Sequence, residues 1–426
     1  MESVDIVTPR PSGTLRPAQG RLVWLDALRG LAALAVVFEH SLDALLPELR
    51  QAVSPSFDFG RYGVFVFFLV SGYVVPASLE RRGSVREFWI GRLFRIYPLW
   101  AVAAAIGLAF ALAEVYWGLN QRLAERPWTS ALAHLLMLQD LLQTPNVLNV
   151  FWTLSYEMAF YLLVTAMYVA GVHRASAHTA LGFGAGAVAV VALAPLFPLA
   201  LPAGVGTVYA VAALLVAGLA AVLTRDPLLR RGGAAVLAAV PLVLLVLNSR
   251  IGAAESLAIV ATMFAGTAVY RIERGTLGPW AWWAVGLVPV LSVAAGVLAG
   301  RPVGWCAAIT AAWLTFGAGR ALRGRRLPRL LPWLGLISYS VYLLHQVVLQ
   351  VIRRMIGDPA ALSGWERLGW GVVVLAAVLG VGAASYRLVE RPMQDLGRRA
   401  ARASRRRTGE AGRSPAPGPA RPVRAR

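Results

Sequence analysis

Residues 22–46 read LVWLDALRGLAALAVVFEHSLDALL, a predominantly apolar stretch that is long enough to cross a bilayer. Arg29 and His40 lie inside it, although ionisable side chains in a membrane-length segment are costly and are usually kept for a function. They are eleven residues apart, or about three helical turns, so both project from one helix face, roughly 16 Å apart along the axis. The stretch therefore predicts a membrane helix that presents a cation and an imidazole at two depths.

The rest of the chain has the composition of a polytopic membrane protein. Of its 426 residues, 58% are hydrophobic and only 15% are charged. Apolar runs of spanning length fall at 23–46, 62–79, 96–118, 151–171, 179–200, 204–223, 233–248, 252–270, 279–299, 302–319, 333–352 and 366–386. The run 233–248 is the weakest, so we expect an all-α transmembrane helical bundle of about 10–12 spans. Residues 131–150 are amphipathic and are expected to lie at, or dip into, the outer interface.

The arginine distribution predicts the orientation. All 41 basic residues are arginine, which we interpret first as the coding bias of a GC-rich bacterial genome. With a cytoplasmic N-terminus, 31 arginines fall in inner segments, nine in outer loops, and Arg29 in the first span. This split predicts that both termini are cytoplasmic, and we expect an integral protein of the bacterial cytoplasmic (inner) membrane.

The terminal segments, the net charge and the single cysteine limit which partners and cofactors can be expected. Residues 1–21 and 393–426 are expected to be disordered cytoplasmic tails around a transmembrane domain at 22–392. The net charge of +20 sits in loops and tails, which favours contact with anionic membrane lipid over nucleic acid, for which no motif is present. Cys306 is the only cysteine, so neither a disulfide framework nor a cysteine metal site is expected, and no metal is predicted.

The first span carries two possible side-chain partners for its functional candidates. Asp26 lies three residues before Arg29, and Asp43 lies three residues after His40 on the same face, where it could orient the ring. The alternative is a structural Arg–Asp pair with a core histidine. We favour a functional role because the cation and the imidazole share one face of one span.

Two further segments on the cytoplasmic side have both a structural and a functional interpretation. FFLVSGYVVPAS, from Phe67 to Ser78, places Ser71 next to a glycine, which permits close helix packing or a broken helix around a ligand. RRGSVREFWIGRLFRIYPLW, from Arg81 to Trp100, is expected to be an inner loop in which Arg92 and Arg95 share one helix face. Arginine suits bidentate phosphate recognition, so a phosphorylated cytosolic ligand and simple membrane anchoring are equally open there.

Other polar groups are predicted at a depth similar to that of His40. In FWTLSYEMAFYLL, Glu157 and Tyr161 are four residues apart on one face, with Trp152 and Ser155 near the mouth. In WLGLISYSVYLLHQVVLQVI, His345 lies about 18 Å from the start of its span. An imidazole with a carboxylate suits general-base activation of a hydroxyl. The remaining histidines fall at interfaces or in a loop and are interpreted as solvated or structural: His134, His173 and His178.

Six segments in order resemble the acyltransferase-3 family of integral-membrane O-acyltransferases. They are LDALRGLAALAVVFEH with Arg29 and His40, FFLVSGYVV from Phe67, RLFRIYPLW from Arg92, WTLSYEMAFY from Trp152, ISYSVYLLH from Ile337, and VERP from Val389. Residues 172–330 carry no matching motif, and the twelve predicted spans exceed the ten-span core associated with the family.

The resemblance implies an enzyme that transfers an acyl group, often acetyl, from cytosolic acyl-CoA to a hydroxyl of a sugar or glycan, as in polysaccharide modification of a cell envelope. It implies that His40 is the general base or a transient acyl carrier and that the arginines meet the CoA phosphates, while Glu157 and Tyr161 shape the acceptor side. The candidate catalytic residues are His40, Glu157, Tyr161 and His345; the donor-binding residues are Arg29, Arg92 and Arg95; the substrate-binding residues are Ser71, Trp152 and Ser155.

Two alternatives remain open beside this reading. Within the same family, the acceptor could be a small natural product such as a macrolide sugar. In another class, the chain could export a polysaccharide or an acyl intermediate. A transporter should show broken helices in two symmetric halves, whereas here the polar motifs crowd into the first 161 residues and one late span. The sequence therefore favours the enzyme.

Overall fold

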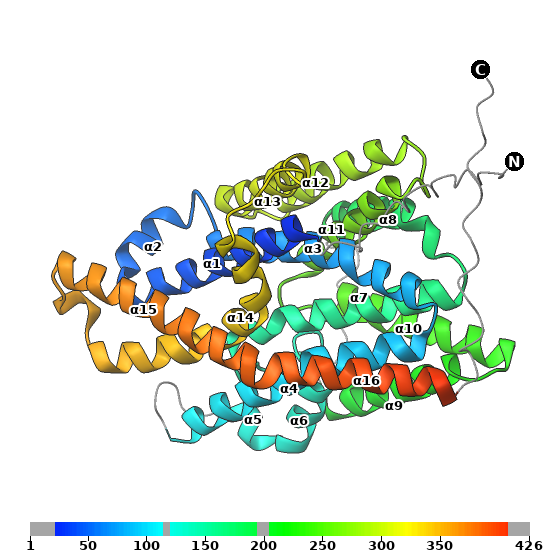
Figure 1. The fold of residues 1–426 in the computed structure, drawn as a ribbon, viewed down its shortest axis with the longest axis horizontal. Helices are drawn as coiled ribbons and strands as arrows, with labels where there is room; N and C mark the ends of the chain where they lie inside the picture. The colour runs from blue at the N-terminus through cyan, green and yellow to red at the C-terminus, as the bar shows by residue number, and fades with distance from the viewer. Residues whose placement is uncertain (1–21, 114–119, 194–203, 408–426) are drawn as a thin grey trace, which may run out of the picture.

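A computed structural model of the chain describes residues 22–113, 120–193 and 204–407, and all regular elements in these ranges are helices. The long helices are α1 (Val23–Leu45), α3 (Phe59–Arg82), α4 (Val85–Leu112), α7 (Trp152–Val169), α8 (Ser176–Leu193), α9 (Val205–Val222), α10 (Pro227–Leu247), α11 (Ala253–Glu273), α12 (Ala281–Leu298), α13 (Val303–Ala321), α14 (Leu330–Ile356), α15 (Gly364–Ser385) and α16 (Arg391–Arg407). The short ones are α2 (Pro47–Val53), α5 (Gln121–Glu125), α6 (Pro127–Leu135), the 3-10 turns η1 (Asn149–Phe151), η2 (His173–Ala175) and η3 (Pro359–Ala361), and the π-helical turn η4 (Tyr386–Glu390). Figure 1 shows most of the long helices running side by side in one bundle.

The fold class predicted from the sequence is confirmed. Each of the twelve predicted apolar runs overlaps one long helix, and ten helices in the described ranges are long and apolar enough to cross a membrane. Helix α1 falls outside these ten because it carries Asp26, Arg29, Glu39 and Asp43. Helix α1 packs against α14 and α3 and its Glu39 is buried, so protein groups rather than lipid lie against much of its polar content.

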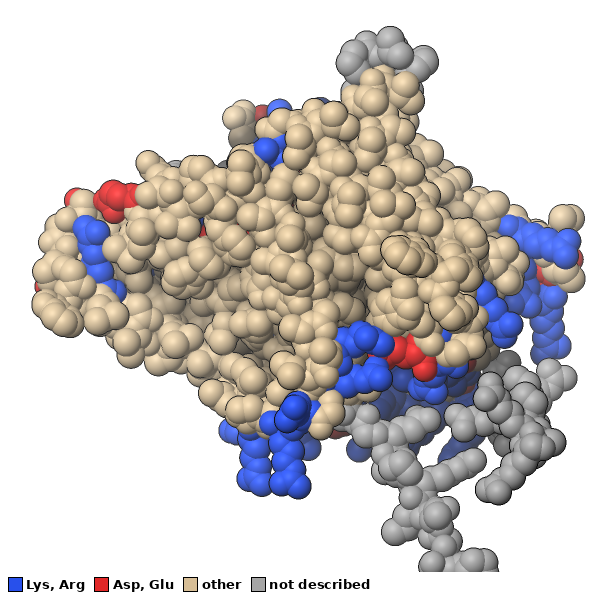
Figure 2. Space-filling view, turned by 90° about the horizontal axis from the view of Figure 1, so that it is seen from above, with Lys and Arg blue, Asp and Glu red and all other residues tan. Residues whose placement is uncertain are grey.

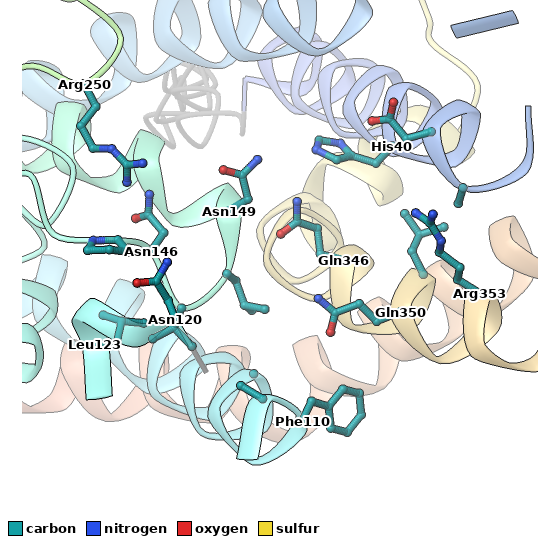
Figure 3. A pocket seen from close by; sticks show the side chains of 18 residues that line it. His40, Phe110, Asn120, Leu123, Asn146, Asn149, Arg250, Gln346, Gln350 and Arg353 are labelled. Atoms are coloured by element: carbon teal, nitrogen blue, oxygen red, sulfur yellow. The ribbon is translucent and has the colours of Figure 1, made fainter. Parts of the chain in front are cut away.

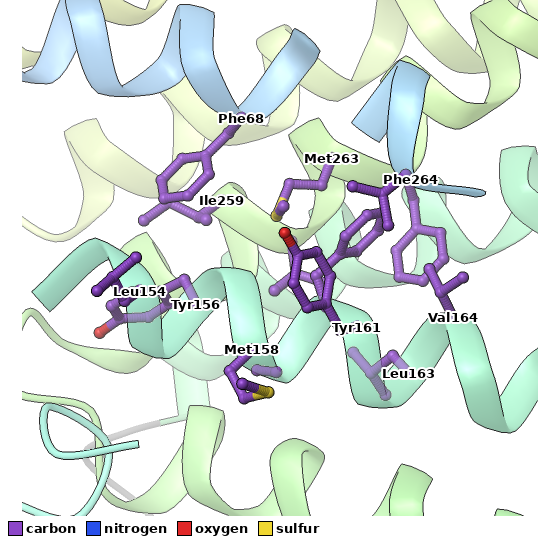
Figure 4. Packing of buried hydrophobic residues seen from close by; sticks show 14 of the residues in the cluster. Phe68, Leu154, Tyr156, Met158, Tyr161, Leu163, Val164, Ile259, Met263 and Phe264 are labelled. Atoms are coloured by element: carbon purple, nitrogen blue, oxygen red, sulfur yellow. The ribbon is translucent and has the colours of Figure 1, made fainter. Parts of the chain in front are cut away.

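Helix α11 is the centre of the packing. It lies against α3, α8 and α12, and nearly all of its apolar window is buried. Gly72 of α3 and Gly266 of α11 lie backbone to backbone, so a side chain at either position would meet the main chain of the other helix. Aromatic and methionine side chains of α3, α7 and α11 fill the layer beside this crossing (Figure 4). Small residues at the crossing allow van der Waals packing without a hydrophobic driving force in lipid.

The arginine-rich stretch 81–100 is not the loop that the sequence predicted. Helix α3 ends at Arg82, Gly83 follows with a left-handed φ of 67°, and Ser84 caps α4 by accepting from the Glu87 backbone N–H at 3.3 Å. The turn is so short that α4 begins at Val85 and already contains Arg92 and Arg95. Both arginines therefore sit in a helix of the bundle.

The segment 131–150 dips into the bundle. After α6 the chain turns through Met137 and Gln143, both with left-handed φ, and most of its side chains are buried. Several of its polar groups find protein partners: Gln139 donates to the Phe151 carbonyl at 2.9 Å, and Tyr156 donates to Asp140 at 2.9 Å. These partners replace water for the buried groups, so the segment packs within the protein.

The predicted disordered tail is wrong for residues 393–407. These residues belong to α16, which packs along α4 through Gly397, Ala401 and Ser404, with Gly397 directly against Phe94. The composition suggested disorder because the helix is rich in arginine, but its packed stripe of small residues supplies the contact that orders it. Arginine side chains gather along one edge of the molecule in Figure 2, while most of that face is uncharged. The predicted tails 1–21 and 408–426 lie outside the described residues.

Candidate active site

The site is built on the close crossing of α1 and α14. Gly30 of α1 lies against Leu334 and Gly335 of α14, and a Cβ on Gly30 would come within 2.7 Å of the Leu334 Cβ. His40 follows Gly30 by ten residues, and His345 follows Gly335 by ten residues. Because equal helical steps rise equally, the two histidines arrive at the same height on facing helices. Their ring centroids are 5.0 Å apart.

Both imidazoles present the same nitrogen to the site. His40 Nδ1 is 2.9 Å from the Val36 carbonyl oxygen, and His345 Nδ1 is 2.7 Å from the Tyr342 carbonyl oxygen. Each carbonyl can only accept, so each Nδ1 is the protonated donor and each Nε2 carries the lone pair. His345 is fully buried, and its Nε2 has no hydrogen-bond partner among the described residues. The pair is therefore arranged to accept a proton from a ligand.

His40 opens onto a cavity of about 620 Å³, here called the larger cavity. Figure 3 shows amide side chains facing one another across it, with His40 at one side and Arg250 opposite. Its polar lining comes from α1, the N-cap of α5, the segment before α7, the turn between α10 and α11, and the second half of α14: His40, Asp43, Asn120, Asn146, Asn149, Arg250, Gln346, Gln350 and Arg353. Neutral amides can both donate and accept hydrogen bonds, which matches a ligand rich in hydroxyls.

A second, smaller cavity of about 80 Å³ lies nearer the start of α1 and α14. Arg29, Ser71, Arg95 and Glu157 line it, together with Tyr342 of α14. Along α14, Ser338 to Tyr342 face the smaller cavity and Gln346 to Arg353 face the larger one, so the buried His345 lies between them. The structure thus separates Arg29 from His40: they lie on one helix face, as predicted, but line different cavities.

The two arginines of the smaller cavity are held without close partners. In the described part of the chain, neither Arg29 nor Arg95 forms a hydrogen bond or an ion pair within 4.0 Å, although Glu157 lies in the same cavity. Two such guanidinium groups in one enclosed space favour an anionic ligand with several oxygens.

Arg92 has a different environment from Arg95. It is 8% exposed, donates to the Ser78 hydroxyl at 3.0 Å, and its guanidinium lies 5.4 Å from the ring centres of both Phe88 and Tyr161. It therefore supports the wall behind the smaller cavity rather than lining it. Tyr161 is buried and its hydroxyl donates to Glu157, so these two residues belong with the arginines rather than with the larger, amide-lined cavity.

Trp152 and Ser155 line neither of the two cavities. Arg61 lies over the Trp152 ring at 4.8 Å, and the fully buried Ser155 accepts from the Asp140 backbone N–H at 3.2 Å. Burial raises the pKa of Asp140, while the hydrogen bond from Tyr156 acts in the opposite direction. These contacts anchor the loop that borders the larger cavity.

The other histidines have structural contacts, in line with their prediction. His134 donates from Nδ1 to the Ser130 carbonyl at 2.8 Å, and its Nε2 accepts from the Val147 backbone N–H at 3.2 Å. The rings of His173 and His178 lie against Tyr168 and Trp280. Among the described residues, no group of three or more His, Cys, Asp or Glu side chains could hold a metal ion.

Several residues at the site were not predicted from the sequence. Among the amides of the larger cavity, Asn120, Asn146 and Asn149 lie in turns or at helix ends, where such residues are common, so nothing in the sequence marks them. Gln346 and Gln350 lie within α14 and were not singled out. Tyr342 was given no role from the sequence; its hydroxyl is hydrogen-bonded to the Thr153 hydroxyl at 2.9 Å, and its ring lies beside His345. One signal was available: the repeated Gly–His spacing of ten residues in α1 and α14 indicates that the two histidines meet.

Comparison with known proteins provides an independent line of evidence. A family model described as an acyltransferase domain matches residues 22–387. Acyltransferase MdmB of Streptomyces mycarofaciens is 34% identical over 161 residues, which cover 36% of this chain and 40% of that protein. Nodulation protein 10 of Rhizobium leguminosarum bv. viciae is 29% identical over 154 residues, which cover 32% of this chain and 41% of that protein. The chain thus spans about two fifths of the length of these curated relatives, and no solved structure matches it.

Proposed function

Because this chain belongs to the acyltransferase-3 family of membrane acyltransferases, whose domain covers residues 22–387, we propose that it moves an acyl group, most simply acetyl, from a coenzyme A thioester to a hydroxyl of a saccharide. The observation that carries the proposal is the His40–His345 pair, which stands between an arginine-lined cavity and an amide-lined one.

The donor is assigned to the smaller cavity. Arg29 and Arg95 would bind phosphate oxygens of CoA, since their guanidinium groups have no close protein partner. The acyl end would then reach past Tyr342 toward the histidine pair. A cavity of about 80 Å³ is too small for a pantetheine arm, so donor binding has to widen it by side-chain movement.

The acceptor is assigned to the larger cavity. Its volume of about 620 Å³ and its amide lining suit a sugar unit, whose hydroxyls donate and accept hydrogen bonds. His40 is the ionisable candidate base that borders this cavity directly, and its Nε2 lone pair can receive the proton of an acceptor hydroxyl.

The reaction balances with these groups alone. His40 Nε2 takes the hydroxyl proton while the oxygen attacks the thioester carbonyl; a C–O bond forms, the C–S bond breaks, and the proton passes to the leaving thiolate. The products are an ester and free CoA. The same geometry also permits a transient acyl group on His40, so direct transfer and a two-step route both fit the site.

The test is release of free CoA by purified protein in lipid, with acetyl-CoA as donor. His40→Ala should lower turnover by a factor of about 10² to 10⁴, the usual contribution of a general base. His178→Ala is the matched control, because its ring lies tilted against that of Trp280, with centroids 4.8 Å apart, and lines neither cavity. A fully active, folded His40→Ala variant would remove His40 from the mechanism, and a wild type that neither binds nor turns over acetyl-CoA would reject the proposed donor.

The acceptor and the location are further parts of the proposal. We infer an envelope or secreted saccharide as acceptor, with a small natural product such as a macrolide sugar as the alternative; a panel of both, measured by ester formation, separates them. Membership of an acyltransferase family leaves the exporter reading without support. The bacterial cytoplasmic membrane and cytoplasmic termini, inferred from the arginine distribution, can be tested by reporter fusions at each end.

A further inference from the structure

The π-helical turn η4 between α15 and α16 changes which side chain faces the site. On α15 the buried stripe runs through Val374, Val378 and Gly382. In a regular α-helix the next inward position two turns later is seven residues on, which is Val389. The structure instead buries Glu390, at 3% exposure, and leaves Val389 half-buried.

Helix α16 continues in the register that the π-helical turn η4 sets. Gly397 lies seven residues after Glu390 and is the first buried residue of α16, where it packs against Phe94 of α4. The extra residue of the π turn thus sets the inward face of α16 as well as that of Glu390. Single π turns inside α-helices occur frequently at functional sites.

Two side chains donate hydrogen bonds to the Glu390 carboxylate, one to each oxygen. The Ser340 hydroxyl donates to Oε2 at 2.9 Å, and the Gln394 amide donates to Oε1 at 2.9 Å. The turn η4 also packs against α4 and α14, the helices that carry Arg95 and Tyr339 of the smaller cavity. A buried carboxylate is costly unless its charge is compensated.

Arg95 of the smaller cavity supplies the compensating positive charge. The Glu390 carboxylate attracts the Arg95 guanidinium, and it attracts Arg29 more weakly. The two do not form an ion pair within 4.0 Å in the described structure, so the Arg95 guanidinium stays available to a ligand. No other role in the site has been assigned to this carboxylate.

We propose that Glu390 is a positioning residue: the one-residue shift of the π turn turns its carboxylate into the bundle beside the helix of Arg95, where its negative charge offsets the repulsion between the Arg95 and Arg29 guanidinium groups and lets both stay at the smaller cavity. The inference rests on the proposed function in one respect, that the ligand of Arg95 is the phosphate group of the acyl donor. The register and the pairing of charges stand apart from the identity of that ligand.

The test is a double-mutant cycle with Glu390→Gln and Arg95→Gln, in the full chain in lipid. Glu390→Gln keeps the size of the side chain and removes its charge, and we expect KM for acetyl-CoA to rise about tenfold with kcat within about twofold. In the Arg95→Gln background, Glu390→Gln should add nothing further. The proposal would be overturned if the two substitutions raised KM independently, so that their fold-changes multiplied in the double variant. An unchanged or lower KM in Glu390→Gln would overturn it as well.

A control and a second readout separate this inference from the proposed function. Glu80→Gln removes a carboxylate that is paired with the buried Arg271 away from both cavities, and it should leave KM unchanged. If the wild type does not use acetyl-CoA, the proposed function fails. The coupling is then measured from the unfolding temperatures of the wild type, the two single variants and the double variant. Non-additive shifts support the Glu390–Arg95 coupling, and additive shifts reject it.

The register argument makes its own prediction. Deleting Leu388 removes one residue of η4, so a regular α-helix again places the glutamate seven positions after Gly382 and keeps α16 in phase. We expect this deletion to keep KM near the wild-type value. Exchanging positions 389 and 390 by V389E and E390V should instead reproduce the Glu390→Gln defect, and the opposite order of effects would contradict the role of the register.

Discussion

Substituting Gly30 by alanine tests whether the α1–α14 crossing sets the geometry of the histidine pair. A Cβ at this position would lie 2.7 Å from the Leu334 Cβ, 3.0 Å from the Gly335 nitrogen and 3.1 Å from the Leu331 carbonyl oxygen. Two of these three atoms belong to the main chain, so the strain cannot be relieved by turning a side chain.

The helices therefore have to separate, by roughly 0.5–1 Å if ordinary contacts are restored, and overpacking of this kind costs about 1–3 kcal/mol of stability. His40 and His345 are ten residues beyond this crossing on the same two helices, so their separation grows with it. A misplacement of about 1 Å can lower a rate about 10²-fold. We expect Gly30→Ala to lower the unfolding temperature and to lower CoA release by between ten- and a hundredfold.

The assay pairs thermal unfolding in lipid with release of free CoA from acetyl-CoA. The control is Gly286→Ala on α12, where a Cβ would meet nothing within 4 Å. That variant should be as stable as the wild type or about 0.5–1 kcal/mol more stable, because alanine favours the helix. A Gly30→Ala protein that matches Gly286→Ala in both measurements would refute the reasoning.

Two further predictions concern hydrogen bonds of named side chains. Tyr161→Phe removes the hydroxyl that donates to Glu157, and because a half-buried carboxylate loses its donor, the free energy of unfolding should fall by about 1 kcal/mol. Tyr209→Phe, at an exposed position of α9, should change it little, and equal effects of the two would contradict the inference. Burial lowers the pKa of His134 below its usual 6.5, so the unfolded chain takes up a proton first as the pH falls. Stability from this group is complete above pH 6.5 and is lost as the pH drops below that value toward the folded pKa; His134→Gln should therefore show a flatter decline of unfolding temperature between about pH 8 and pH 5.5 than the wild type, and parallel declines would exclude His134 as a contributor.

The sequence determined the helices and most of the residues that meet at the site. A hydrophobic run of spanning length has to form a helix in lipid, because only a helix satisfies its own backbone groups, and twelve such runs therefore predicted twelve long helices correctly. Polar residues inside these runs, or just before one as with Arg95, also stood out. Arg29, His40, Arg95, Glu157 and His345 all lie at or between the two cavities.

Only the tertiary structure decided how these residues are divided between the two cavities. Arg29 and His40 share a helix face, yet they line different cavities because α14 crosses α1 between them. Ser155 looked like a mouth residue, but the buried loop before α7 covers it. Hydrophobic periodicity carries no information about which helices are neighbours, since lipid and protein interiors are equally apolar.

The C-terminal helix shows the same limit most clearly. Its composition is that of a solvated tail, and its order depends on small residues that match the surface of α4. A one-residue π turn then selects Glu390 rather than Val389 for the interior. The sequence by itself determined which segments are helical and which polar groups are unusual. The packing of helix on helix decided which of those groups meet, because contacts between distant segments depend on shape and not on local pattern.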